Sequence, residues 1–201
     1  MPTLDTPYVF VDLDLMEANL ARLQTYLDQH GLANRPHIKT HKIPALARRQ
    51  VALGAVGITC QKLGEVEVMA EAGLTDIFLP YNLVGAAKLD RLGQLLKAVS
   101  LSLTTDSAVV AKGLSSAAQQ AGRELTILVE CDLGARRCGV QSPQEAADLA
   151  RVIARLPGLR FGGLMTYPNR SELDDFVGAM RALLGGELPI ERVSGNNSAY
   201  I

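Results

Sequence analysis

The chain has 201 residues, of which 48% are hydrophobic and 20% charged, and its formal net charge is −1. This length and composition suit one globular domain with a sizeable core and exclude disordered and fibrous proteins. The balanced charge gives no basis for binding nucleic acid or an anionic membrane, and no apolar run approaches the ~18 residues of a membrane span. Three cysteines without metal-ligand spacing, and no apolar leader, predict a cytoplasmic protein.

Apolar segments alternate along the chain with longer amphipathic segments, which predicts repeating strand–helix units. The predicted strands are Pro36–Thr40, Val56–Cys60, Asp76–Pro80, Leu101–Thr105, Leu125–Cys131, Leu159–Thr166 and Ile190–Ser194. The predicted helices are Pro44–Leu53, Leu63–Ala72, Ala86–Lys97, Ser107–Ala121, Pro143–Leu156 and Glu172–Leu184. Ser142-Pro143 is typical of a helix start, and Gly73 and Gly122 are typical of helix ends.

Such units join parallel strands by right-handed crossovers. Seven strands without a Gly-x-Gly-x-x-Gly turn favour a (β/α) barrel over a doubly wound sheet. A closed barrel of this type has eight strands. We therefore expect either that the chain is part of a longer protein, which is the favoured interpretation, or that Tyr8–Asp12 supplies the missing strand.

The segment Arg35-Pro-His-Ile-Lys-Thr-His-Lys42 is the most informative. If it is a strand, Arg35, His37, Lys39 and His41 share one face at a spacing of ~6.6 Å. Neighbouring positive groups and partial burial would then favour a neutral Lys39 amine, which is the form that bonds to an aldehyde. A solvated basic face, or a site that binds an anion through the lysine charge, explains the same spacing.

This segment, together with Thr6-Pro-Tyr-Val-Phe-Val-Asp-Leu-Asp14 and Gly54–Gly73, resembles the D-threonine aldolase and D-serine dehydratase family. The resemblance implies a (β/α)8 TIM-type barrel of pyridoxal 5'-phosphate (PLP) fold type III. Residues 1–201 would form an alanine-racemase-like N-terminal barrel that lacks the last barrel unit and the C-terminal β-domain. The resemblance also implies that Lys39 forms the internal aldimine with PLP.

Two further strand ends match this family. In Val129-Glu-Cys-Asp-Leu-Gly-Ala-Arg-Arg-Cys-Gly-Val140, the resemblance places Arg137 near the phenolic oxygen of PLP, and after the sixth strand it places Tyr167 near the pyridine ring. A surface ion pair for Arg137 and a wetted lid position for Tyr167 are the structural alternatives. We expect Glu130 and Asp132, which share a strand face, to neutralise nearby basic groups.

The seventh strand ends in Val193-Ser-Gly-Asn-Asn-Ser-Ala199, where barrels commonly bind phosphate. By resemblance, Ser198 supplies the phosphate-binding hydroxyl, and Ser194, Gly195 and Asn197 are supporting contacts. An ordinary Asn/Ser turn is the alternative. His37 is a further candidate for cofactor binding, although a histidine here is more often structural.

The resemblance implies a PLP-dependent lyase that acts on a small D-β-hydroxy amino acid as a D-threonine aldolase or D-serine dehydratase does. A racemase of the same fold and a non-catalytic PLP-binding or homeostasis protein are the alternatives. We expect a homodimer, no metal ligands in this chain, and a divalent metal only in a longer parent protein. The isolated 201 residues should be poorly active.

Overall fold

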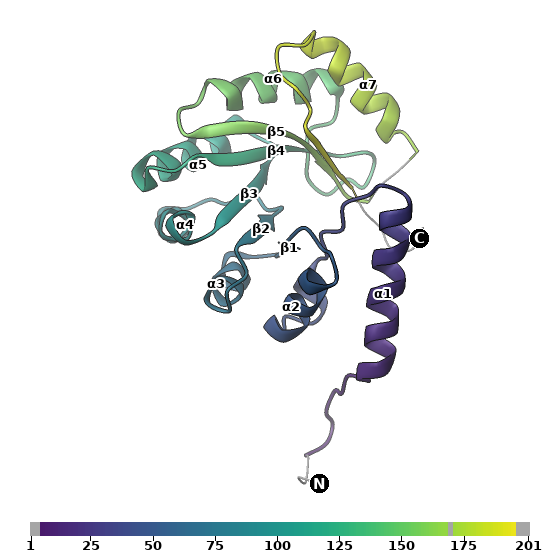
Figure 1. Cartoon of the computed structure of the whole chain (residues 1–201). Coiled ribbons are helices and arrows are strands. Elements are labelled where there is room, and N and C mark those ends of the chain that lie inside the picture. The colour runs from purple at the N-terminus through teal and green to yellow at the C-terminus, as the bar shows by residue number, and fades with distance from the viewer. Residues whose placement is uncertain (1–4, 169–170, 196–201) are drawn as a thin grey trace.

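The computed structural model describes residues 5–168 and 171–195. It contains one parallel sheet of six strands, whose spatial order β1-β2-β3-β4-β5-β6 is the order in the chain. The strands are β1 (Ile58–Thr59), β2 (Asp76–Leu79), β3 (Ser100–Thr105), β4 (Leu125–Cys131), β5 (Leu159–Thr166) and β6 (Arg192–Gly195). The α-helices are α1 (Leu13–Gln29), α2 (Pro44–Ala52), α3 (Leu63–Glu71), α4 (Ala86–Ala98), α5 (Ala108–Ala121), α6 (Pro143–Arg155) and α7 (Leu173–Leu184). The sheet curls like part of a barrel wall, with α2–α7 along its outer side and α1 apart from them (Figure 1).

The two faces of the sheet have different side chains because successive residues of a strand point to opposite sides. Ile77, Leu103 and Ile127 are fully buried in the large core that the strands share with the outer helices. Phe78 and Leu128, the next residues along β2 and β4, belong instead to a small separate cluster on the inner face. The predicted barrel-type α/β architecture is therefore confirmed, with the main core between the sheet and its helices.

The helix boundaries follow the local signals in the sequence. At the start of α6, the Ser142 hydroxyl accepts a hydrogen bond from the Glu145 N–H at 3.2 Å, and Pro143 occupies the first turn, where no donor is needed. Helix α5 ends at Gly122, whose φ of 63° is the left-handed conformation that glycine adopts readily. Each of the six predicted helices is present to within one residue at either end.

The predicted strand Pro36–Thr40 is wrong. Pro36 accepts a hydrogen bond from the Thr59 N–H at 2.8 Å and His37 forms one bridge with Thr59, but the chain then enters a short 3₁₀ helix, η1 (Ile38–Thr40). The imidazole Nδ1 of His37 accepts a hydrogen bond from the Lys39 N–H at 3.3 Å, and this local bond competes with strand pairing. The expected alternation of four basic side chains on one face is therefore also wrong.

The N-terminal residues also differ from expectation. Residues 8–12 form no strand and are exposed, so Tyr8–Asp12 does not extend the described sheet. Helix α1 follows, and the Asp12 carboxylate caps it by accepting a hydrogen bond from the Leu15 N–H at 3.0 Å. Only Gln24 and Leu27 of this helix are buried. None of the helices in residues 5–168 and 171–195 has the length and apolar character needed to cross a bilayer.

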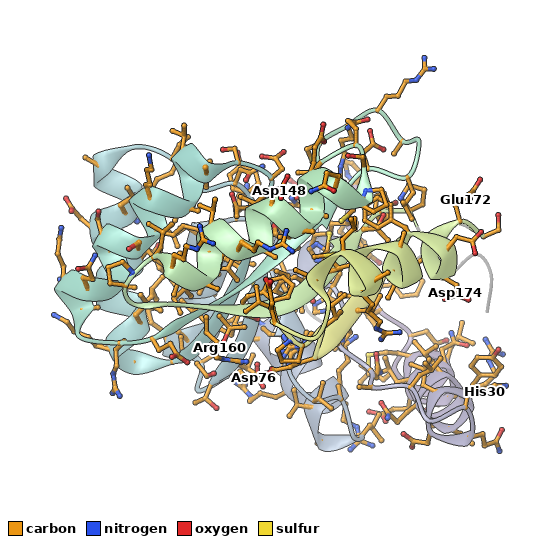
Figure 2. The ribbon with its side chains drawn as sticks, turned by 90° about the horizontal axis from the view of Figure 1, so that it is seen from above. His30, Asp76, Asp148, Arg160, Glu172 and Asp174 are labelled. Atoms are coloured by element: carbon orange, nitrogen blue, oxygen red, sulfur yellow. The ribbon has the colours of Figure 1, made fainter. Side chains whose placement is uncertain are left out.

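Ion pairs gather at the amino-terminal end of the sheet. Arg35 contacts Asp76 at 2.7 Å, and Arg160 on β5 pairs with Glu191 before β6. Asp76 and Arg160 lie close together in the view from above (Figure 2). Burial, followed by the positive charges of Arg35 and Arg160, lowers the pKa of Arg192. Arg35 therefore belongs to this end of the sheet and is separated from Lys39, contrary to the sequence prediction.

The pairing of β5 with β6 depends on a glycine. The register between β4 and β5 shifts after Ile127, and Gly163 has a φ of 132°. A Cβ atom on Gly163 would overlap the carbonyl oxygen of Arg192, the residue opposite it on β6. The absence of a side chain at this position allows the last described strand to join the sheet.

Candidate functional site at the carboxyl ends of the strands

Lys39 lies at the carboxyl-terminal side of the sheet, in the turn η1. The neighbouring Ile38 is completely buried and anchors the turn, whereas the Lys39 side chain is exposed. The partial burial expected around the lysine is therefore not found. Within the described residues, no carboxylate forms an ion pair with the Lys39 amine, which lies 5.4 Å from the centre of the Tyr167 ring. The amine is available to a ligand.

His37 organises this turn from inside it. Its Nε2 lies 3.2 Å from the Gln61 Oε1, and its Nδ1 accepts the Lys39 backbone N–H. Burial, and next the charge of Lys39, lowers the pKa of His37. A neutral ring with its proton on Nε2 satisfies both contacts. Both ring nitrogens are thus used inside the protein, which gives His37 a structural position beside the lysine.

The end of the turn is held by helix α3. Lys42 has a φ of 55° and its amine forms an ion pair with the Glu65 Oε1 at 3.6 Å. The second carboxylate oxygen of Glu65 accepts a hydrogen bond from the Gln61 N–H at 2.8 Å. Since Gln61 also contacts His37, the segment after β1 contacts the lysine turn on both sides of Lys39.

The loop after β4 folds back onto its own strand. Asp132 Oδ1 accepts hydrogen bonds from three successive N–H groups, at residues 134, 135 and 136. Burial alone would raise the pKa of Asp132, but these bonds and one from Gln141 lower it. Gly139 has a φ of 116° and approaches the strand so closely that a Cβ atom would lie 2.6 Å from the Asp132 nitrogen. Asp132 therefore has a structural role in shaping this loop.

The folded loop brings Arg137 and Cys138 to a buried carboxylate on the inner face of β4. Glu130 is 2% exposed, and its Oε1 lies 3.0 Å from the Arg137 guanidinium and 2.9 Å from the Cys138 Sγ. Its Oε2 accepts a hydrogen bond from the Thr104 hydroxyl on β3 at 3.3 Å. Burial, and next the hydrogen bond to Glu130, raises the pKa of the Cys138 thiol to about 11. The expectation that Glu130 neutralises a basic group is confirmed for Arg137.

Tyr167 joins the lysine turn to this loop. It follows β5, and its ring centre lies 5.4 Å from the Lys39 amine and 4.9 Å from the Arg137 guanidinium carbon. Both distances are in the range of cation–π contacts. Residues 39, 137 and 167, which are far apart in the sequence, therefore meet at one end of the sheet.

The predicted phosphate-binding segment, residues 193–199, is described only as far as Gly195. Ser194 and Gly195 pair with Met165 and Thr166 at the end of β6, next to the strand that leads to Tyr167. No hydrogen bond links them to Lys39 or Arg137 within the described residues. The predicted contacts Asn197 and Ser198 lie outside the described residues. The phosphate-binding assignment stays a prediction.

The chemistry of this end of the sheet fits PLP. The Lys39 amine, which forms no ion pair among the described residues, and the Arg137 guanidinium, which is paired with a buried carboxylate, both lie against the ring of Tyr167. An aldehyde and an anionic oxygen would both have a partner there. In the described part of the chain, no three His, Cys, Asp or Glu side chains gather closely enough to hold a metal ion.

Comparison with known proteins agrees with this arrangement. The family model described as "Alanine racemase, N-terminal domain" matches residues 11–201. The chain belongs to the alanine racemase N-terminal domain family. The chain is 44% identical over 164 residues to a D-threonine aldolase from Arthrobacter sp., covering 82% of this chain and 43% of that protein. It is 36% identical over 189 residues to D-threo-3-hydroxyaspartate dehydratase from Delftia sp. strain HT23, covering 90% of this chain and 48% of that protein.

The fold of this chain is also similar to that of a solved structure. The structure of D-threonine aldolase from Filomicrobium marinum superposes with a TM-score of 0.79 at 41% identity, covering 81% of this chain and 44% of that one. The predicted resemblance to D-threonine aldolases is thus confirmed. The chain spans a little under half the length of these curated relatives.

Sequence reasoning missed several residues that shape the site. Glu130 was assigned only charge neutralisation, and the contacts of Cys138, Gln61 and Glu65 were not predicted. The alternation of side chains places Glu130 on the same face as Leu128, so it pointed inward. The return of the loop after β4, which supplies its partners, left no comparable signal.

Proposed function

We propose that this chain is the PLP-binding barrel part of a lyase that acts on small D-β-hydroxy amino acids. The observation that carries the proposal is the meeting of Lys39 and Arg137 on the ring of Tyr167, at the carboxyl ends of parallel strands. Active sites of parallel barrels lie at that end. The similarity to proteins named D-threonine aldolase and D-threo-3-hydroxyaspartate dehydratase supports the substrate class and the lyase reaction.

The proposed roles follow from the chemistry of the side chains. Lys39 would hold the aldehyde end of PLP, Arg137 would face its phenolic oxygen, and Tyr167 would lie near its ring. Ser194 and Gly195, with Asn197 and Ser198, would contact the phosphate. When bound, PLP supplies an electron sink for the carbon atoms of the substrate.

The residues of the chain would then do three things. The Lys39 amine would accept and return a proton at the substrate Cα. The Arg137 guanidinium keeps a fixed positive charge where negative charge gathers. The turn, which the hydrogen bond of His37 stabilises, keeps Lys39 at the carboxyl ends of the strands. The homodimer, the cytoplasmic location and a divalent metal in a longer parent protein stay predictions.

Covalent trapping tests the proposal. We would mix the purified chain with PLP, record the absorbance spectrum, reduce with borohydride and map the modified peptide by mass spectrometry. The expected result is a visible band that reduction removes and a single adduct on Lys39. Lys39→Ala should lose both signals, whereas the matched Lys42→Ala, three residues away, should keep the adduct. A chain that forms no adduct, or one scattered over surface lysines, contradicts the proposal.

Turnover is a second test. With D-threonine or D-3-hydroxyaspartate, we expect slow release of an aldehyde or an oxo acid from protein that has been loaded with PLP and not treated with borohydride. L-threonine is the matched control, since the proposed site is specific for the D configuration. Equal turnover of both enantiomers would contradict the assignment to D-amino acids.

A further inference from the structure

The buried carboxylate of Glu130 has no role in the function proposed above. It is almost fully excluded from solvent, at 2% exposure, and an ionised carboxylate in such a position is strongly destabilising unless hydrogen-bond donors surround it. Three donors do so, from Thr104, Arg137 and Cys138. Two of these three come from the single loop that follows β4, and only the third comes from another strand.

The two carboxylate oxygens of Glu130 contact different parts of the fold. Oε2 faces the Thr104 hydroxyl on the neighbouring strand β3, which links the carboxylate to the sheet. Oε1 faces both the Arg137 guanidinium and the Cys138 thiol, which come from the loop that follows β4. The carboxylate therefore joins the sheet to the loop at the position of the arginine.

Arg137 has few other constraints on its position. Its side chain is 45% exposed, and its interactions among the described residues are with the carboxylate of Glu130, the neighbouring Cys138 thiol and the ring of Tyr167. An exposed arginine has several rotamers of similar energy, so a charge-assisted bond to a fixed carboxylate selects one of them. The adjacent Cys138 thiol remains protonated at neutral pH and donates to the same oxygen.

We propose that Glu130 is a positioning residue. Its carboxylate, hydrogen-bonded to Thr104 and Cys138, holds the Arg137 guanidinium at the carboxyl ends of the strands, where the arginine would contact the cofactor. The consequence for PLP rests on the proposed function. The contact between Glu130 and the loop does not, and can be tested in the absence of PLP.

Glu130→Gln is a suitable variant because the amide has the shape of the carboxylate. Its oxygen can face Arg137 and Cys138, and its NH₂ group can donate to the Thr104 hydroxyl, so each hydrogen bond has a replacement while the charge is lost. Glu124→Gln is the matched control. Glu124 immediately precedes β4 and its carboxylate pairs with Arg160 at 3.4 Å, at the opposite end of the sheet.

The first measurement uses the full chain without PLP. Because Cys60 and Cys131 are buried, Cys138 is the partly accessible thiol of the three, and iodoacetamide reacts with its thiolate. At about pH 8.5, each unit by which the thiol pKa falls gives roughly tenfold more thiolate. We expect Glu130→Gln to raise the rate of Cys138 alkylation at least about tenfold and Glu124→Gln to leave it unchanged. Equal rates in all three proteins would overturn the proposal.

The second measurement is a PLP titration, followed by absorbance, in wild type, Glu130→Gln, Arg137→Met and the double variant. We expect Glu130→Gln to weaken PLP binding roughly tenfold, the effect of losing about one charge-assisted hydrogen bond. If Glu130 acts through Arg137, the same change should have almost no effect once the arginine is methionine. Equal losses in both backgrounds, or no loss in either, would overturn the positioning role.

The two proposals fail in different ways. If the wild-type chain binds no PLP, the proposed function fails, and the alkylation rates alone decide whether Glu130 holds the loop. If the wild-type chain binds PLP on Lys39 but Glu130→Gln binds it equally well, the proposed function stands and the positioning role is refuted. Thermal unfolding of each variant identifies any that fail to fold. Glu130→Asp keeps the charge but is shorter by one methylene, so we expect it to bind PLP more weakly than wild type does.

Discussion

Gly163→Ala should detach the last described strand from the sheet. The methyl group would overlap the carbonyl oxygen of Arg192, and the φ of 132° is a conformation that alanine rarely adopts. Such backbone strain costs about 1–3 kcal/mol. Movement of β6 away from β5 would also weaken a ladder of four paired residues, in which each hydrogen bond contributes about 0.5–1.5 kcal/mol. We expect a loss of roughly 3–5 kcal/mol in the free energy of unfolding, a large share of the ~5–15 kcal/mol typical of a domain.

Urea unfolding followed by circular dichroism measures this loss, and hydrogen exchange of the β6 amides locates it. The matched control is Gly178→Ala, an exposed position inside α7 where a methyl group would meet nothing within 4 Å. That change should stabilise the protein by up to about 1 kcal/mol, because alanine favours a helix more than glycine does. A Gly163→Ala protein with wild-type stability and fully protected β6 amides would refute the close-approach argument.

Two further predictions concern the core and the histidines. Ile127→Ala should cost about 2–5 kcal/mol in the free energy of unfolding, because it leaves a cavity in the core between sheet and helices, whereas the exposed Val109→Ala should change it by less than about 0.5 kcal/mol; urea unfolding distinguishes them. Burial lowers the pKa of both His37 and His41, so the unfolded chain binds protons more readily, and this contribution to stability is present above about pH 6.5 and is lost as the pH falls below it. The free energy of unfolding measured between about pH 7 and 5 should therefore fall more steeply in wild type than in a His37→Gln/His41→Gln variant, and parallel curves would contradict it.

The repeating part of the fold could be predicted from local signals. Six predicted strands and six predicted helices are present because period, capping residues and glycine positions all act within a few residues of one another. Helix α1 was missed although Asp12 caps it and Leu20, Leu23 and Leu27 have helical spacing. The preceding residues Val9, Phe10 and Val11 are β-branched or aromatic, and this composition favours a strand.

The lysine turn could not be predicted from alternation. His37 and Lys39 are two residues apart in either a strand or a turn, so the spacing is the same for both. Tertiary contacts stabilise the turn: His37 forms a bridge with Thr59 and a hydrogen bond with Gln61, and Lys42 forms an ion pair with Glu65. The meeting of Lys39 with Arg137 likewise depends on the curvature of the sheet, for which a single sequence has no local signature.

The agreement between strand order and chain order has a consequence for biosynthesis. Each strand after β1 pairs with the strand made just before it, as Ile77 on β2 does with Ile58 on β1. A chain that emerges from the ribosome at about 5–20 residues per second can therefore add one unit at a time to a growing edge, without waiting for a distant segment. The edge to which the next strand is added always belongs to the most recently made strand. Arg137 and Tyr167 emerge well after Lys39, so the candidate site is assembled only when β4 and β5 have been added.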